Sequence, residues 1–236
     1  MNEPILNMKN IRTELVRFML QYKFALKEIE TKIDILKEEF HHIHEYNPIE
    51  HVSSRLKSPQ SIFNKMIHKG CQFNFEEIKE KIRDIAGVRI ICSFTEDIYK
   101  ILDMLQNQED VKVIQVKDYI KNPKPNGYRS LHLIIQIPIF MSDRTEHVYV
   151  EIQIRTIAMD FWASLEHKIY YKYNKEIPAH IKQGLTDAAN QAAQLDKKME
   201  DLNKEINILK EQDAKNGSEF STELLQQFSQ HLFPLE

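Results

Sequence analysis

The sequence contains little glycine, little cysteine and no long apolar run. Glycine makes up 5 of 236 residues, below a usual share of about 7%, which disfavours short strands joined by glycine-rich turns and favours long helices. The longest apolar stretch, Leu131–Met141, is interrupted by Gln136 and Pro138 and is far shorter than the roughly 20 residues of a membrane-spanning helix. The N-terminal residues lack an apolar core and a cleavage-like site, so we expect no signal peptide.

Two cysteines, Cys71 and Cys92, cannot build a disulfide framework, and we expect both to be free and buried in a reducing compartment. Hydrophobic residues form 42% of the chain, which is too many for an extended disordered protein. A chain of 236 residues is long enough for one large or two small domains. These features predict a soluble cytoplasmic protein.

The net charge of −3 argues against a general nucleic-acid coat protein, but the charges are unevenly distributed. Residues 51–70 carry no acid and four basic side chains, Arg55, Lys57, Lys65 and Lys69. Residues 111–136 carry five basic side chains against one acid, Asp118. This segregation indicates either a local site for an anionic ligand or basic residues scattered over a solvated face.

Apolar side chains recur three or four residues apart between Ile11 and Phe40. This spacing predicts one long amphipathic helix, which ends before the Asn47-Pro48 turn signal. We therefore divide the chain into an N-terminal helix at 1–46, a core at 47–175 and a C-terminal helical extension at 176–236.

The extension contains a heptad pattern. From Ile181 to Leu209 the apolar steps alternate between four and three through four heptads. Such a stripe needs a partner surface, which is either the body of this protein or another copy of the chain. Asn216-Gly217 is expected to end this zone, before a short helix or a loose tail at 220–233.

The core mixes strand and helix patterns. β-Branched and apolar runs predict strands at 86–94, 111–120, 131–140 and 146–155. Helices are expected at 61–69, ended by Gly70, at 95–107 with Thr95 as the N-cap, and at 156–171. The sum is an α+β fold in which helices pack on a sheet of at least four strands.

The last predicted strand carries a polar row. Because side chains alternate along a strand, one face holds Tyr149, Glu151, Gln153 and Arg155. In an isolated strand such a row usually faces solvent. Here the strand runs directly into a helix with the single tryptophan, so both faces are expected to be covered and the polar row to line a cavity.

Two charged residues flank the first predicted strand of the core. Asp84 precedes the strand and Arg89 lies within it. A buried arginine needs a carboxylate or another anion, because an unpaired buried charge costs several kcal/mol. Arg89 therefore pairs with Asp84 or a glutamate, or it contacts a phosphate or a nucleobase.

Two further segments suit a nucleotide. Prolines and an Asn-Gly pair make 121–127 a loop, and it ends with Tyr128, Arg129, Ser130 and His132. A tyrosine beside such cations suits base stacking with phosphate binding, although packing is the commoner role of a turn tyrosine. A helix start bracketed by cations is a phosphate cradle, and here Ser61 is expected to cap it among Arg55, Lys57 and Lys65.

Five ordered segments resemble the synthetase domain of the RelA/SpoT homologue family. They read SRLKSPQSI, DIAGVRI, NGYRSLH, EIQIRT and AMDFWASLEHKIYYK, and the resemblance covers about residues 47–173. The long enzymes of that family also carry a hydrolase domain with a His-Asp metal motif and a C-terminal regulatory region, but this sequence has no His-Asp dipeptide. The chain is therefore similar to the single-domain small alarmone synthetases, and NPIEH and IYYKYN resemble the RelP type more than the RelQ type.

The resemblance implies a fold, a reaction and partners. The fold would be nucleotidyltransferase-like, with a mixed sheet of about five strands flanked by helices. The reaction would transfer the β,γ-pyrophosphate of ATP to the 3′-hydroxyl of GTP or GDP, giving AMP and pppGpp or ppGpp, without hydrolase activity. A homotetramer is implied, whereas no membrane and no stable nucleic-acid partner are expected.

The resemblance also implies residue roles. Asp84 would hold Mg²⁺ against the ATP phosphates, and Glu151 would be the general base on the 3′-hydroxyl and a second metal ligand. The residues that would bind ATP are Arg55 and Arg89, on either side of the adenine, and Lys57, Ser61 and Lys65, at the phosphates. The residues that would bind GTP or GDP are Tyr128, stacked on guanine, with Lys117, Lys124, His132, Gln153 and Asp160.

Some positions depart from the family pattern. Family members often have Asn at the position of Asp160, and Arg at the positions of His68 and Lys117. An aspartate near guanine would suit its N1–H and amino donors, so this departure bears on the acceptor contacts and not on the reaction. His68 weakens any claim to an ATP-phosphate contact at that position.

The histidine run His41, His42 and His44 is too tightly spaced for one helical face. A surface cluster is favoured over a regulatory Zn²⁺ site, and both remain open. Two other functions compete with alarmone synthesis: a tRNA pyrophosphokinase toxin of the same fold, and a non-catalytic nucleotide- or RNA-binding module. Tyr128, the expected guanine-stacking residue, disfavours the tRNA toxin. Asp84 and Glu151 disfavour the non-catalytic module, because such a module would not need the two carboxylates.

Overall fold

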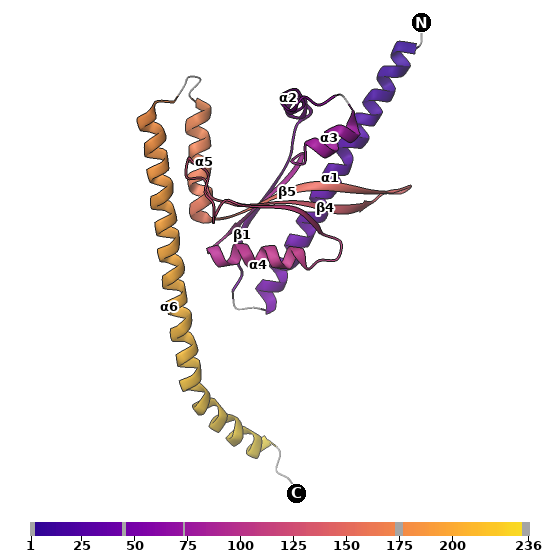
Figure 1. Cartoon of the computed structure of the whole chain (residues 1–236). Coiled ribbons are helices and arrows are strands. Elements are labelled where there is room, and N and C mark those ends of the chain that lie inside the picture. The colour runs from indigo at the N-terminus through magenta and orange to yellow at the C-terminus, as the bar shows by residue number, and fades with distance from the viewer. Residues whose placement is uncertain (1–2, 44–45, 73, 173–176, 233–236) are drawn as a thin grey trace.

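A computed structural model describes residues 3–43, 46–72, 74–172 and 177–232 (Figure 1). The elements in chain order are α1 (Glu3–Ile43), β1 (Ile49–Leu56), α2 (Pro59–Lys69), α3 (Phe75–Lys81), β2 (Ala86–Cys92), α4 (Thr95–Gln106), β3 (Lys112–Asp118), β4 (Leu131–Phe140), β5 (Thr145–Thr156), α5 (Ile157–Lys172) and α6 (Ala179–Leu232). The division of the chain at 46/47 and 175/176 remains a prediction.

The five strands form one mixed sheet in the order β1-β2-β5-β4-β3. β2 and β5 are parallel, and the other neighbouring pairs are antiparallel. The predicted α+β class with a mixed sheet of about five strands is therefore confirmed. β1 and α3 were not predicted individually: β1 is an edge strand whose side chains are mostly exposed, so it lacks the apolar alternation that marks a strand, and α3 has 7 residues.

Helices α1 and α4 cover one face of the sheet. α1 contributes Tyr22, Ile29 and Ile33, which are fully buried in the same core cluster as Ile98 and Ile101 of α4. The strands add their inward-facing rows to this cluster, including Val88, Ile90, Val150, Ile152, Leu133 and Ile135. Removing this apolar area from water supplies the main stabilisation of the fold.

The opposite face of the sheet is polar. Glu151 lies beside Gly87 of β2 and Ile134 of β4 in the strand register. One register step further, Arg89, Gln153, His132 and Lys117 form a row across four strands. In Figure 1, α2 and α3 lie above the sheet and α5 lies beside its left end, while α4 lies below the sheet. The predicted polar row of β5 therefore belongs to a continuous polar surface.

Helices α5 and α6 run side by side (Figure 1). The Trp162 indole donates to the carbonyl oxygen of Leu185 at 2.9 Å, which ties the two helices together. Ala189 and Asp196 of α6 are buried against the body of the protein, whereas much of the heptad stripe further along α6 stays exposed.

Several predicted helix ends need correction. Ser61 does not cap α2: the N-cap is Ser58, whose hydroxyl accepts from the Ser61 backbone N–H at 3.2 Å. The N-cap of α4 is Phe94 rather than Thr95. Gly70 ends α2, as predicted, and its φ is 61°.

The Asn216-Gly217 pair does not end the C-terminal zone, because α6 runs as one helix from Ala179 to Leu232. The alternative of a loose tail is wrong up to residue 232, and Phe233 lies outside the described residues. Cys92 is buried and free as expected, whereas Cys71 is free but only partly buried. Within the described ranges, every helix is too short or too polar to traverse a lipid bilayer.

The packing of α1 predicts a clear contrast between two isoleucines of that helix. Ile29 is fully buried and Ile35 is 60% exposed. Ile29→Ala is expected to lower the free energy of unfolding by about 2–5 kcal/mol, because it leaves a cavity under the sheet. The control Ile35→Ala should change it by less than about 0.5 kcal/mol. Urea denaturation followed by circular dichroism measures both, and equal effects would contradict the assignment of α1 to the core.

Candidate active site

A carboxylate held by two lysines stands where β1, α2 and β2 meet. The Lys57 N–H donates to the Ile85 carbonyl oxygen at 2.8 Å, which brings the end of β1 beside the start of β2. Lys57 Nζ then donates to Asp84 Oδ2 at 2.6 Å, and Lys65 Nζ from α2 donates to the same oxygen at 2.5 Å.

The second oxygen of Asp84 is available. Asp84 Oδ1 is buried, and no hydrogen-bond partner reaches it from the residues that the structure describes. Burial by itself raises the pKa of this carboxyl, but the hydrogen bonds and charges of Lys57 and Lys65 outweigh it and hold the pKa below its ordinary value. The carboxylate is therefore charged at neutral pH, and one of its oxygens is left without a partner among the described residues.

Glu151 lies at the centre of β5 on the same polar face. Gln153 Nε2 donates to Glu151 Oε2 at 2.9 Å, and His132 Nδ1 is 3.7 Å from Glu151 Oε1. Burial raises the pKa of Glu151, and the charge of Asp84 raises it slightly further, but His132 and Gln153 bring the net pKa below its ordinary value. Glu151 is thus an ionised carboxylate with both oxygens oriented by neighbours.

Asp84 and Glu151 line one cleft of about 460 Å³. The cleft is rimmed by basic side chains, and its other lining residues are Lys65, Lys69, Lys81, Arg83, Lys117, Glu80, Gln115 and Ile134. A cleft lined by five cations and by three carboxylates, Glu80 in addition to Asp84 and Glu151, suits a polyanion that brings a metal ion with it.

A smaller pocket of about 110 Å³ adjoins this cleft, with Glu151 in both linings. Arg55 of β1 and Arg89 of β2 both line it. The Arg55 side chain lies over Gly87: a Cβ at Gly87 would be 3.5 Å from Arg55 Nε, which is ordinary van der Waals contact. The two predicted adenine-binding arginines are therefore brought to one pocket.

Within the described ranges Arg89 pairs with Asp160 and with neither Asp84 nor a glutamate, which corrects the expected ion pair. Its NH1 is 3.2 Å from Asp160 Oδ1, and its buried Nε has no hydrogen-bond partner in the described part of the chain. Asp160 Oδ1 also accepts from Arg155 NH1 at 3.1 Å. Asp160 is thus a bridge between two arginines, so its carboxylate is already engaged.

Tyr128 is surrounded by other predicted acceptor residues. Its hydroxyl is 2.7 Å from His132 Nε2 and accepts from Arg155 NH2 at 2.5 Å. Lys124 Nζ lies 4.6 Å from the centre of the Tyr128 ring. Lys117 is exposed and pairs with His132 in the register of β3 and β4. The acceptor set predicted from the sequence is therefore gathered around one end of the polar face.

Other predicted residues lie further from the two pockets. Ser61 is exposed in the first turn of α2, its hydroxyl 2.9 Å from that of Ser58, and it lines neither pocket. His68 is exposed in the last turn of the same helix. His42 Nε2 lies 3.3 Å from Glu38, and His44 is outside the described residues. Across the described ranges, no group of three or more His, Cys, Asp or Glu side chains is arranged to hold a metal.

The prediction missed a polar network on the far rim of the cleft. The Tyr149 hydroxyl donates to Glu80 Oε1 at 3.1 Å, and the Arg83 guanidinium lies 4.7 Å from the centre of the Tyr149 ring. Arg83 NH2 also donates to Glu80 Oε2 at 2.9 Å. The run of charges just before Asp84 was the available signal for these residues.

Comparison with known proteins agrees with this geometry. A family model described as "Region found in RelA / SpoT proteins" matches residues 54–176. The chain is 53% identical over 200 residues to GTP pyrophosphokinase YwaC of Bacillus subtilis, a match that covers 85% of this chain and 95% of that protein. The chain therefore belongs to the RelA/SpoT family.

Solved structures place it beside the small members of that family. The crystal structure of small alarmone synthetase 2 from Bacillus subtilis matches with a TM-score of 0.75 at 53% identity, covering 81% of this chain and 99% of that one. Small alarmone synthetase 1 from the same organism, bound to its product pppGpp, matches with a TM-score of 0.75 at 37% identity, covering 82% and 98%.

The lowered pKa of Asp84 predicts a pH-dependent contribution to stability. The ionised form is stabilised in the folded state, so this contribution is present above the unfolded pKa of about 3.9 and is lost as the pH falls through the lower folded pKa. Asp84→Asn should therefore unfold more easily than the wild type at pH 7, and the difference should shrink below about pH 4. Urea titrations across this range measure it, and a difference independent of pH would contradict the prediction.

Proposed function

We propose that this protein is a GTP/GDP pyrophosphokinase, which transfers the β,γ-pyrophosphate of ATP to the 3′-hydroxyl of GTP or GDP and acts in the cytoplasm. The observation that carries the proposal is the pair of ionised carboxylates, Asp84 and Glu151, on one cation-rimmed cleft. The relatives named above, one of them holding pppGpp, support the same reaction. Membership of the RelP type stays a prediction.

The donor set of the cleft fits Mg²⁺. Asp84 Oδ1 is a buried oxygen without a hydrogen-bond partner among the described residues, and Glu151 supplies a second carboxylate on the same cleft. Mg²⁺ is commonly bound by one or two carboxylates together with substrate phosphates. When bound, it would neutralise charge on the transferring phosphates.

Glu151 is the proposed general base. Its lowered pKa keeps it deprotonated at neutral pH, which is the state that can accept the proton of the 3′-hydroxyl. Gln153 holds one carboxylate oxygen and His132 approaches the other, so the group is oriented before substrate binds. Positioning of this kind and electrostatic stabilisation account for most of the catalysis of phosphoryl transfer.

The ATP subsite is proposed to lie along β1, α2 and β2. Arg55 and Arg89 line the pocket that would receive the adenine, and the planar guanidinium groups suit stacking on a base. Lys57 and Lys65 meet at Asp84 and would exchange part of that contact for the phosphates. Ser61, in the first turn of α2, would add a hydroxyl donor.

The acceptor subsite is proposed around Tyr128, whose ring would stack on guanine. Lys117, Lys124 and His132 would bind the acceptor phosphates, and Gln153 would support them through Glu151. Both arginine contacts of Asp160 are made by Oδ1, so its other carboxylate oxygen would be left to accept from the guanine donors. Asp160 would then contact the base together with Tyr128.

The assignment of the base is tested by Glu151→Gln. We expect the rate of product formation to fall about 10²–10⁴-fold, while the affinity for nucleotides measured by calorimetry changes little. Thin-layer separation of radiolabelled products from ATP with GDP, with GTP and with deacylated tRNA measures the reaction and its acceptor. The control Glu146→Gln changes a glutamate of the same strand that lies outside the cleft lining. Unchanged turnover in Glu151→Gln would refute the assignment of Glu151 as the general base. Product formed with tRNA but with neither GDP nor GTP would show that tRNA is the acceptor.

A homotetramer is also proposed, with the α6 stripe as its contact. Leu195, Met199, Leu202, Ile206 and Leu209 are each between 45% and 59% exposed. This apolar row continues the heptad pattern beyond the part of α6 that packs on α5. A second copy of the chain would remove it from water.

The double variant Met199→Asp/Leu202→Asp tests the stripe. Charges placed in an apolar contact cost several kcal/mol when buried unpaired, so the variant is expected to sediment as a smaller species than the wild type. Gln194→Asp, an exposed change on the same helix, is the control and should sediment as the wild type does. Identical sedimentation of all three proteins would show that the α6 stripe does not form the contact between copies of the chain.

A further inference from the structure

The end of the loop before β4 packs against α5 and α6. The Gly127 N–H donates to the Lys124 carbonyl oxygen at 2.8 Å, and the Lys124 N–H donates to the Tyr128 carbonyl oxygen at 3.1 Å, so 124–128 forms a closed turn. Tyr128 leaves this turn and packs beside Trp162 and Ala189. The proposed guanine-stacking residue is therefore held on the helical hairpin that follows the sheet.

Gly127 is the point of closest approach. Its φ is 86°, which disfavours any residue with a side chain. A Cβ at this position would lie 2.5 Å from the Cβ of Ala189 and 3.6 Å from the Thr186 carbonyl oxygen. Loop and helix thus fit only because both positions are small.

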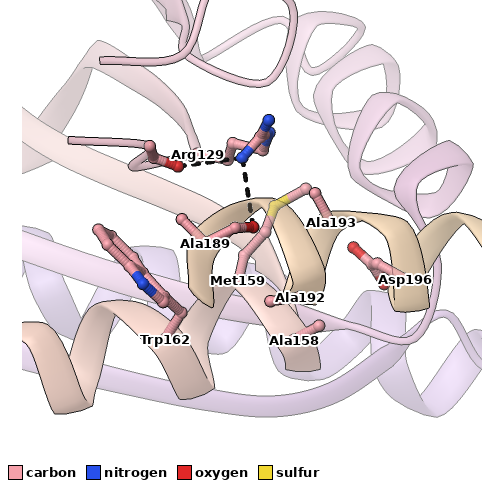
Figure 2. Close-up of a pocket in the computed structure, with 9 residues that line it drawn as sticks. Arg129, Ala158, Met159, Trp162, Ala189, Ala192, Ala193 and Asp196 are labelled. Atoms are coloured by element: carbon pink, nitrogen blue, oxygen red, sulfur yellow. Dashed lines mark hydrogen bonds between the residues drawn. The ribbon is translucent and has the colours of Figure 1, made fainter. Parts of the chain in front are cut away.

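Arg129 fastens the same turn from the other side. Its place beside the loop lysines suggests a nucleotide contact, but its NH1 donates to the Gly127 carbonyl oxygen at 3.1 Å and to the Ala189 carbonyl oxygen at 3.5 Å (Figure 2). Its NH2 donates to Asn190 Oδ1 at 3.4 Å. In Figure 2 the side chain spans the gap between the turn and α6 above Ala189.

Asn126 ties the turn to α5. Its Nδ2 donates to Glu166 Oε1 at 3.1 Å, and its Oδ1 accepts from the Tyr128 N–H at 3.2 Å. Trp162 joins α5 to α6 through its bond to Leu185. The turn is therefore attached to both helices of the hairpin by polar contacts as well as by packing.

We propose that Arg129, together with the Gly127–Ala189 contact, is a clamp through which α6 positions Tyr128 for the acceptor nucleotide. This inference rests on the proposed function, because it takes Tyr128 to bind GTP or GDP. Arg129 is a positioning residue. Its guanidinium hydrogen-bonds to the turn and to α6, and it is not proposed to contact the substrate. The ATP subsite on β1, α2 and β2 contacts the hairpin through the pair of Arg89 with Asp160 of α5, but it makes no hydrogen bond or ion pair with α6 among the described residues. The clamp on α6 is therefore expected to act on the acceptor.

The test compares the two Michaelis constants. In Arg129→Ala and in Ala189→Leu, the KM for GDP is expected to rise about tenfold, as for loss of charge-assisted hydrogen bonds, while the KM for ATP stays within about twofold. Arg129→Lys, which keeps the positive charge but has one donor nitrogen in place of the guanidinium fork, should give an intermediate KM for GDP. A change that merely weakened the fold would move both constants or the amount of active enzyme instead.

Matched controls are available for both changes. Arg144→Ala removes an exposed hairpin arginine that pairs with Asp143 and Glu146, and Ala179→Leu enlarges an exposed alanine at the start of α6. Neither is expected to change either KM. Circular dichroism and the KM for ATP report whether each variant is folded.

The outcomes separate the two proposals. A wild type that forms no product from ATP with GDP or GTP overturns the proposed function. An active wild type with an unchanged KM for GDP in Arg129→Ala, or with KM values for ATP and GDP raised in parallel, overturns the clamp alone. If Arg129→Ala does not fold, Arg129→Lys with a wild-type KM for GDP overturns the clamp as well.

Discussion

The site depends on a carboxylate that two lysines hold through a single oxygen. Asp84 joins the end of β1, the second turn of α2 and the start of β2, because Lys57, Lys65 and Asp84 come from those three places. Without the carboxylate, two ammonium groups would lie close together with no anion between them. With it, they are neutralised in part, and the other carboxylate oxygen is buried and has no hydrogen-bond partner among the described residues. The two ion pairs of this one carboxylate thus stabilise the fold through one oxygen and leave the other oxygen as a candidate metal ligand.

The alternation of β5 supplies both the core and the chemistry. Val150 and Ile152 are buried under α1 and α4, while Glu151, between them, faces the cleft, and Gln153, after them, lines the adjoining smaller pocket. A shift of one residue in the register of β5 would exchange its apolar and polar rows. It would bury the Glu151 carboxylate and expose Val150 and Ile152. The energetic preference of the apolar row for the core therefore positions the catalytic row on the other face.

Strong periodic patterns were readable from the sequence, and three-dimensional pairings were not. β4 was predicted at its observed bounds because its apolar run is long and regular. β1 was not predicted, because an edge strand that is exposed at most positions shows no alternation of apolar and polar residues. The gathering of Asp84 and Glu151 followed from the family resemblance. The engagement of Asp160 with Arg89, and the turning of Arg129 toward α6, depend on packing between segments far apart in the chain, which no local pattern records.

The parallel pairing of β2 with β5 has a consequence for synthesis of the chain. Ala86 lies beside Val150, and these positions are separated by α4, β3 and β4. The central pair of the sheet therefore cannot form until β5 has left the ribosome, since domains fold as units during synthesis and long-range pairing must first close a large loop. Until then β2 has only its antiparallel neighbour β1. A nascent chain consequently has no assembled carboxylate pair, and nucleotide chemistry begins only after the last strand has docked.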